Sequence, residues 1–262
     1  MLHALRVAWT FFKIGLLNEF AYRANLYLQL LQSGVAVGAA LGGLLVVFGH
    51  TESLGGWGHD EILAVLGVYL LMSAAMGGVI EPSMARLMED VREGTLDYTL
   101  TKPVEVQFLI SISDIRVWKL VDVALGVIVL AVALIRRGDA VTVADSAGFA
   151  LMLLAGGAII YSFFLAMAAA SFWFLHIENI FAIFSDVYQA ARWPIGIYPQ
   201  WLRFILTFIV PVAIAVTVPA EAAVGRLTGE RVVLALAVAL FTLVASRLLW
   251  RLGLKRYSGA SA

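Results

Sequence analysis

The sequence predicts an all-α protein that crosses a lipid bilayer six times, and three observations support that prediction. Apolar types make up 62% of its 262 residues and charged types 14%, against roughly 25% charged in an ordinary globular domain. Runs of about 20 apolar residues, enough to cross a hydrocarbon core roughly 30 Å thick, recur along the chain. Lys and Arg gather in alternate connecting segments, as in multi-pass membrane proteins. A formal net charge of zero gives no indication of a nucleic-acid partner.

The segment 2–23 precedes the first apolar run and has the pattern of a helix that lies in the membrane interface. Its large apolar residues at helical spacing share one face: Leu5, Trp9, Phe12, Leu16 and Phe20. Arg6 and Lys13 lie beside that face, which suits a helix with its apolar side in the acyl boundary. The alternative is a simple extension of the first span, because Phe11 and Leu17 blur the pattern.

Five apolar runs are long enough to be membrane spans. Their approximate bounds are 26–48, 61–80, 117–135, 148–172 and 232–250. Within the third run, Asp122 lies one turn from Lys119, and a local ion pair between them is expected because an isolated charge in the bilayer is costly.

Two segments compete to be the fifth span in chain order. The window 204–220 is the more apolar, but Pro211 lies at its centre and Pro219 near its end. Because proline removes a backbone donor and clashes with the preceding turn, this region favours a broken, re-entrant hairpin over about 201–220. The segment 176–197 is more polar, yet its polar residues recur at helical spacing and can share one buried stripe. We prefer 176–197 as the span.

The distribution of Lys and Arg predicts the orientation. Basic residues occur before the first span, in the loop between the second and third spans, and in the C-terminal tail, whereas the loop 49–60 has none. Both termini and the loop between the second and third spans are therefore expected in the cytoplasm. The exceptions, which this topology places outside, are Arg136, Arg137, Arg203, Arg226 and Arg231.

A short amphipathic helix is predicted over 82–93. Pro82 suits the first turn of a helix, where its missing N–H is no loss, and Gly94 suits a left-handed cap after the last turn. Met84, Leu87, Met88 and Val91 recur at i, i+3, i+4 and i+7, opposite a charged face that includes Arg86, Glu89, Asp90 and Glu93. Such a helix is either a solvated surface or a docking element for a soluble partner.

Three stretches of sequence carry a resemblance to a known family. They are Arg-Glu-Gly-Thr-Leu-Asp-Tyr-Thr-Leu-Thr-Lys-Pro-Val at 92–104, Glu-Phe-Ala-Tyr-Arg-Ala-Asn at 19–25, and Pro-Ile-Gly-Ile-Tyr-Pro at 194–199 with Trp-Leu-Arg at 201–203 and the later Pro211. They resemble the cytoplasmic loop, the segment before the first span and the outer-face segment of ABC-2 type permeases, the membrane subunits of a class of ATP-driven exporters. The resemblance covers nearly the whole chain in order and spacing.

The resemblance implies six spans in the cell membrane, both termini inside, an interfacial N-terminal helix and a re-entrant outer hairpin. The implied hairpin decides the choice of 176–197 as the fifth span. It also implies that 82–93 is a coupling helix that contacts an ATPase through Arg86, Glu89, Asp90, Arg92 and Glu93. Family permeases work in pairs above two ATPase subunits, so the expected partners are ABC ATPases, a second permease and the lipid membrane. No cofactor is expected in this chain, and ATP is used by the partner.

The residues themselves agree with a chain that has no catalytic apparatus. No glycine-rich phosphate loop ending in Gly-Lys-Ser/Thr occurs, no zinc spacing joins the four His residues, and no Gly-x-Ser-x-Gly elbow is present. Polar residues of the preferred fifth span are candidates for a translocation path or a seam between two permeases, with hydrogen bonding inside one subunit as the plain alternative. These candidates are His176, Glu178, Asn179, Asp186, Gln189 and Arg192.

Two other functions compete with that of an exporter subunit. A secondary transporter driven by an ion gradient predicts an inverted repeat, and none is visible in the sequence. A membrane scaffold that transports nothing is the second. Since the family handles drugs, lipids, glycans and peptides, the resemblance names no substrate.

Overall fold

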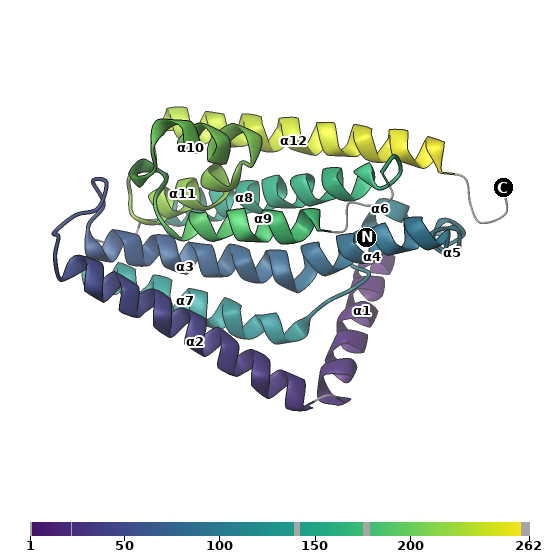
Figure 1. The fold of residues 1–262 in the computed structure, drawn as a ribbon, viewed down its shortest axis with the longest axis horizontal. Coiled ribbons are helices and arrows are strands. Elements are labelled where there is room, and N and C mark those ends of the chain that lie inside the picture. Colours follow the sequence, from purple (N-terminus) through teal and green to yellow (C-terminus); the bar gives the residue numbers. More distant parts are fainter. Residues whose placement is uncertain (1, 22, 139–141, 175–178, 258–262) are drawn as a thin grey trace.

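The computed structural model describes residues 2–21, 23–138, 142–174 and 179–257, and it is helical through that part of the chain, with no strand (Figure 1). This confirms the predicted all-α architecture. The α-helices are α1 Leu2–Ala21, α2 Arg23–Phe48, α3 His59–Ala75, α4 Glu81–Glu93, α5 Asp97–Leu100, α6 Val106–Ser111, α7 Leu120–Arg137, α8 Val143–Ala170, α9 Ile180–Tyr188, α10 Gln200–Phe204, α11 Val212–Ala223 and α12 Gly229–Arg256.

Among the described residues, five helical segments are long and apolar enough to cross a membrane. They are Tyr27–Phe48, His59–Glu93, Val117–Arg137, Val143–Ala170 and Gly229–Arg256. The five apolar runs of the sequence lie in these segments, apart from their end residues 26, 171 and 172. A sixth candidate is a bent pair, Gln200–Thr207 and Val212–Ala223, whose two arms meet at 90°.

α3 and α4 form one continuous helical segment of 35 residues. They are joined by a π-helical turn, η1 (Met76–Ile80), so the predicted short helix is an extension of the second span. Gly94 ends the helix in the left-handed region at φ 71°, as the sequence indicates. Pro82 lies in the first turn of α4, but it does not open a separate helix as predicted, because the helix continues into α4 from the second span. The wider π turn lets the Gly78 carbonyl accept the backbone N–H of Arg116 at 2.8 Å.

The centre of the bundle is α3, most of whose residues are buried. Two glycines allow α3 and α7 to approach closely: a Cβ on Gly67 would lie 2.8 Å from the Leu130 nitrogen, and one on Gly126 would lie 3.0 Å from the Leu71 nitrogen. The glycines of α2 at positions 34, 38 and 42 also have the spacing for close helix packing, but a Cβ placed on any of them would meet no atom of another element within 4 Å. They make no close helix contact within the part of the chain that the structure describes.

α1 is a separate helix. Figure 1 shows α1 and α2 running in different directions, so α1 does not simply extend the first span. Gly15 of α1 lies against the carbonyl of Ile115, in the segment that leads into α7. The side chains of residues 1–5 and 18–26 lie outside the described set, so the predicted apolar face is described only in part.

Both ends of the bent pair lie at the same end of the bundle, beside the loop 49–58. Before the pair, Ile197 packs against Gly55; after it, Arg226 donates to the Gly56 carbonyl at 3.0 Å. The second arm is buried from Val212 through Ala222, and its 12 residues span only about 18 Å, less than the thickness of the hydrocarbon core.

The predicted fifth span, 176–197, is only partly described. Helix is present over α9 and the following 3₁₀ turn η3 (Gln189–Arg192), and residues 176–178 lie outside the described residues. The described helix is shorter than predicted because Trp193 is extended and Pro194 follows it, which ends the helical hydrogen bonds. Tyr188 nevertheless fixes α9 to the bundle centre, since its buried hydroxyl donates to the Tyr69 carbonyl at 3.3 Å.

Three of the five basic residues that break the orientation rule form ion pairs at this end of the bundle: Arg136, Arg137 and Arg226. Glu61 accepts from Arg226 at 2.7 Å and from Arg137 at 3.4 Å, and Asp60 pairs with Arg136 at 3.4 Å. This Glu61 network, composed of these three arginines with Asp60 and Glu61, ties α3 to α7 and to the chain that follows the bent pair. These three exceptions to the charge rule therefore have local partners.

We expect Glu61→Gln to weaken the fold more than Asp60→Asn. The Glu61 side chain is only 21% exposed and serves two guanidinium groups, so its loss should cost about 1 to 3 kcal/mol. The more exposed Asp60–Arg136 pair should contribute at most about 1 kcal/mol. Thermal unfolding of the purified variants in one neutral detergent measures both; equal midpoints for the two variants would contradict the role given to Glu61.

Candidate functional site

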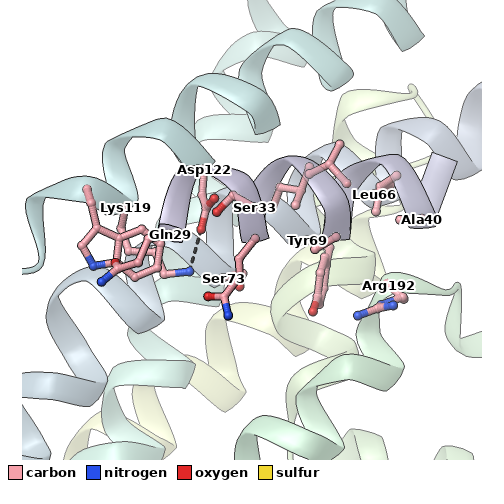
Figure 2. Close-up of a pocket in the computed structure, with 14 residues that line it drawn as sticks. Gln29, Ser33, Ala40, Leu66, Tyr69, Ser73, Lys119, Asp122 and Arg192 are labelled. Atoms are coloured by element: carbon pink, nitrogen blue, oxygen red, sulfur yellow. Dashed lines mark hydrogen bonds and ion pairs between the residues drawn. The ribbon is translucent and has the colours of Figure 1, made fainter. Parts of the chain in front are cut away.

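A half-open polar groove with a volume of about 210 Å³ lies between α2, α3, the start of α7 and η3 (Figure 2). Its polar lining comes from four separate stretches of the chain: Gln29, Gln32, Ser33, Tyr69, Ser73, Trp118, Lys119, Asp122 and Arg192. Apolar side chains of α2 and α3, such as Val37 and Leu66, complete the walls. The fold thus brings charged and polar groups together on helical segments that are long and apolar enough to cross a membrane.

Two helices contribute polar residues to the groove at helical spacing. Gln29, Gln32 and Ser33 of α2 follow i, i+3, i+4, and Tyr69 and Ser73 of α3 follow i, i+4, so each set shares one face. The sequence analysis did not select these residues as a site. Their spacing inside otherwise apolar runs was the signal that would have found them, since polar groups in a span usually face the protein interior.

Lys119 and Asp122 occupy one end of the groove as an ion pair. Their Nζ and Oδ2 atoms are 2.6 Å apart, and the ammonium also lies 4.3 Å from the centre of the Trp118 ring. The predicted local pair is confirmed. Because the Asp122 side chain is only 9% exposed, the lysine compensates a carboxylate that would be costly to bury alone.

Arg192 lies at the opposite end of the groove, with Tyr69 between it and the ion pair (Figure 2). Its guanidinium is 5.5 Å from the centre of the Tyr69 ring, and one nitrogen donates to Gln189 at 3.4 Å. Among the described residues no carboxylate pairs with Arg192, and its buried Nε has no hydrogen-bond partner. One other groove residue has a buried polar atom without a hydrogen-bond partner, namely Gln29 with its acceptor Oε1.

Of the path or seam residues predicted from the sequence, three form one stripe. Gln189 donates to Asp186 and accepts from Arg192, each at 3.4 Å, and Asp186 and Gln189 are exposed. Asn179 instead lies at the start of α9, where its carbonyl accepts the Ile183 N–H. His176 and Glu178 lie outside the described residues. The stripe leads along α9 to the groove.

The second candidate surface is the charged face of α4. Arg86, Glu89, Arg92 and Glu93 are exposed, whereas Met84 and Leu87 are buried in the bundle. Asp90 differs from the other predicted contact residues, because its carboxylate accepts the Thr95 hydroxyl at 3.1 Å. It therefore supports the turn that follows the helix.

The sequence analysis missed one exposed aromatic residue beside this surface. Tyr98 of α5, three residues after the turn at Thr95, is 75% exposed. Tyrosine is a frequent anchor of protein interfaces because it buries a large apolar ring and keeps a hydrogen-bonding group. In the sequence, Tyr98 appeared only as one residue of the run 92–104, and no pattern there indicated that its side chain is exposed.

The segment around α4 is bonded to the bundle at several points. Ser83 exchanges hydrogen bonds with the backbone of Asp114 at 2.9 and 3.2 Å, Glu105 pairs with Arg247 of α12 at 2.8 Å, and Gln107 donates to Tyr161 of α8 at 3.1 Å. Burial and the nearby Asp97 carboxylate raise the pKa of Tyr257, which follows α12. The segment around α4 is thus connected to α8, to α12 and to the chain before α7.

Comparison with known proteins gives one match. A family model described as "ABC-2 family transporter protein" matches residues 35–261 of the chain. A search of curated proteins and a search of solved structures each found no match. Among the described residues, no group of three or more His, Cys, Asp or Glu side chains is placed to hold a metal ion.

We expect Asp122→Asn to destabilise the chain by about 3 kcal/mol, because it leaves the Lys119 ammonium in the bundle without its carboxylate. The double change Lys119→Met with Asp122→Asn should recover most of that loss, since both charges are then gone. Thermal unfolding of the single and double variants tests this. A double variant less stable than Asp122→Asn would contradict it.

Proposed function

The chain belongs to the ABC-2 family of transporter proteins, and we propose that it is the membrane subunit of an ATP-driven exporter. The match covers most of the chain, which is a multi-span helical membrane protein. ABC-2 membrane subunits are typically non-catalytic, so we assign ATP hydrolysis to separate ATPase subunits. The observation that carries this proposal is the continuous helical segment His59–Glu93, which connects an exposed charged face to the interior of the bundle.

The continuous segment explains how an ATPase would act on the transport path. Arg86, Glu89 and Glu93 provide the contact face, and the same helix carries Tyr69 and Ser73 into the groove. Since one segment bears both features, a push on α4 moves groove residues directly. The bonds from this region to α8 and α12 distribute the motion to the far side of the bundle.

The transport path in this proposal follows the polar stripe of α9 and the groove. Asp186 and Gln189 are exposed, and α9 packs against the middle of the second span through Tyr188 and Tyr69. A charged side chain at such a depth costs about 2.5 to 3.5 kcal/mol if it faces lipid. The stripe is therefore better placed against water or against a second permease than against acyl chains, which supports a path between two permeases.

For the topology, we propose that both termini are cytoplasmic and that the bent pair re-enters from the outer face. The location of both of its ends beside the loop 49–58 supports re-entry, as does the short, buried α11. The absence of Lys and Arg from that loop supports its outer location. The fifth crossing then consists of α9 and the residues around it.

Charge reversal on α4 tests the coupling proposal. We expect Glu89→Lys with Glu93→Lys to reduce co-purification of ATPase subunits at least tenfold, because like-charge contacts at a partner's basic rim cost several kcal/mol. Asp90 is left unchanged, since its carboxylate accepts the Thr95 hydroxyl and so supports the turn after α4. The matched control reverses two exposed acids outside the α4 region, Glu52→Lys with Glu230→Lys, and should retain the partner.

The measurement is affinity purification of the full chain from its native membrane, followed by assay of the bound ATPase. A wild-type chain that brings down no ATP-hydrolysing subunit would contradict the proposed function. Equal recovery of ATPase by the two double variants would contradict only the assignment of the contact to α4.

Single cysteines in this cysteine-free chain test re-entry. We expect cysteines at the exposed positions Gln200 and Thr228 to react with an impermeant thiol reagent added outside intact cells. A cysteine at Lys102, in the cytoplasmic loop of the proposal, should react only after the cells are opened. Reaction of positions 200 and 228 from opposite sides would show instead that the bent pair crosses the membrane.

A further inference from the structure

We propose that the groove between α2, α3 and η3 binds the anionic headgroup of a single-chain or multi-chain amphiphile, with Arg192 as the residue that recognises the acid. The proposal rests on the proposed function, because it assigns a chemical class to the substrate of the transport path. The class is an amphiphile whose headgroup carries a phosphate or carboxylate.

The charge of the groove is the first argument. Lys119 is neutralised by Asp122 at 2.6 Å, whereas Arg192 has no carboxylate partner among the described residues. The groove therefore has one uncompensated positive charge. A guanidinium at this depth is costly unless an anion completes it, and its planar set of donors matches the oxygens of a carboxylate or phosphate.

The unpartnered polar atoms are the second argument. A buried hydrogen-bonding atom with no partner costs free energy, and such atoms are rare in folded proteins. Two of the five among the described residues line this groove: the donor Nε of Arg192 and the acceptor Oε1 of Gln29. An acidic headgroup supplies acceptors for the first.

The shape and the apolar lining are the third argument. A volume of about 210 Å³ is below the roughly 300 to 1,000 Å³ of sites that enclose a whole drug-sized ligand, so the groove holds a headgroup and not an entire lipid. It is half-open, and Val37, Ala40, Leu66 and Leu70 line it on α2 and α3. An acyl chain attached to the headgroup leaves over these side chains toward the apolar surface of α2, where Leu31 and Val35 are exposed.

The test measures binding by the full chain in a neutral detergent, with native mass spectrometry used to titrate dodecyl phosphate. We expect one saturable site in the wild-type chain. Arg192→Gln should weaken it about tenfold or more through loss of the charged hydrogen bond, and Arg192→Lys should weaken it less. Arg251→Gln removes the same charge from an exposed position of α12 outside the groove lining and should leave binding unchanged.

A second pair of variants keeps the test valid if Arg192→Gln does not fold. Ala36→Phe fills the groove while Arg192 and its contacts stay in place, so binding should be lost. Ala39→Phe adds the same bulk at an exposed position of α2 that does not line the groove, and it should bind as the wild type does.

Two comparison ligands decide the chemical class. Dodecyltrimethylammonium, with the opposite charge, and inorganic phosphate, without the chain, should each bind at least tenfold more weakly than dodecyl phosphate. Equal binding of the cationic amphiphile would overturn the role of Arg192, and equal binding of inorganic phosphate would overturn the assignment of an amphiphile. Equal effects of Arg192→Gln and Arg251→Gln, or of Ala36→Phe and Ala39→Phe, would also overturn the proposal.

This assay contains no ATPase and no ATP. Failure to bind dodecyl phosphate would therefore leave the co-purification result, and with it the proposed function, unaffected. Conversely, a chain that brings down no ATPase but binds the amphiphile through Arg192 would support the headgroup site and contradict the proposed exporter function.

Discussion

The structure depends on the uninterrupted helical segment His59–Glu93, which passes through the middle of the bundle. Its first turn holds the Glu61 network, its centre packs on α7 at Gly67 and borders the groove at Tyr69, and its last turns form the exposed face of α4. A break in this helix would uncouple all three regions. The π turn η1 accommodates the segment before α7 without such a break, because it frees a carbonyl for Arg116.

Charge compensation is the second constraint on the molecule. Charged groups that would be costly in a bilayer on their own are paired here: Lys119 with Asp122, and Glu61 with two arginines. Arg231 pairs likewise with the buried Glu221 of α11. Within the groove, Arg192 has no such partner among the described residues. The contrast between the paired Lys119 and the unpaired Arg192 supports our assignment of the groove to the transport path.

Local patterns predicted the elements whose causes are local. Three such features follow from residues close together in the chain: the apolar runs, the end of α4 at Gly94, and the Lys119–Asp122 pair. The continuation of the second span through Pro82 into α4 was not predicted. The sequence did not predict that the Asp90 carboxylate accepts a hydrogen bond from the Thr95 hydroxyl. It also did not predict that Gln29, Ser33 and Tyr69 line one groove. It also assigned a longer helix around α9 than the structure describes, since Pro194 limits that helix through its effect on the preceding residue.

The sequence alone determined that this is a helical, multi-span membrane protein, because hydropathy and charge distribution act over single turns and single loops. Its resemblance to ABC-2 type permeases came from three short stretches, at 19–25, 92–104 and 194–203. Only the tertiary structure decided which polar residues meet. Arg226 reaches Glu61 across 165 positions of the chain, and Arg192 joins Gln29 in one groove although the two lie on different helices. Such contacts depend on how helices cross, and crossing geometry is set by packing at positions such as Gly67 and Gly126, whose effect no local pattern contains.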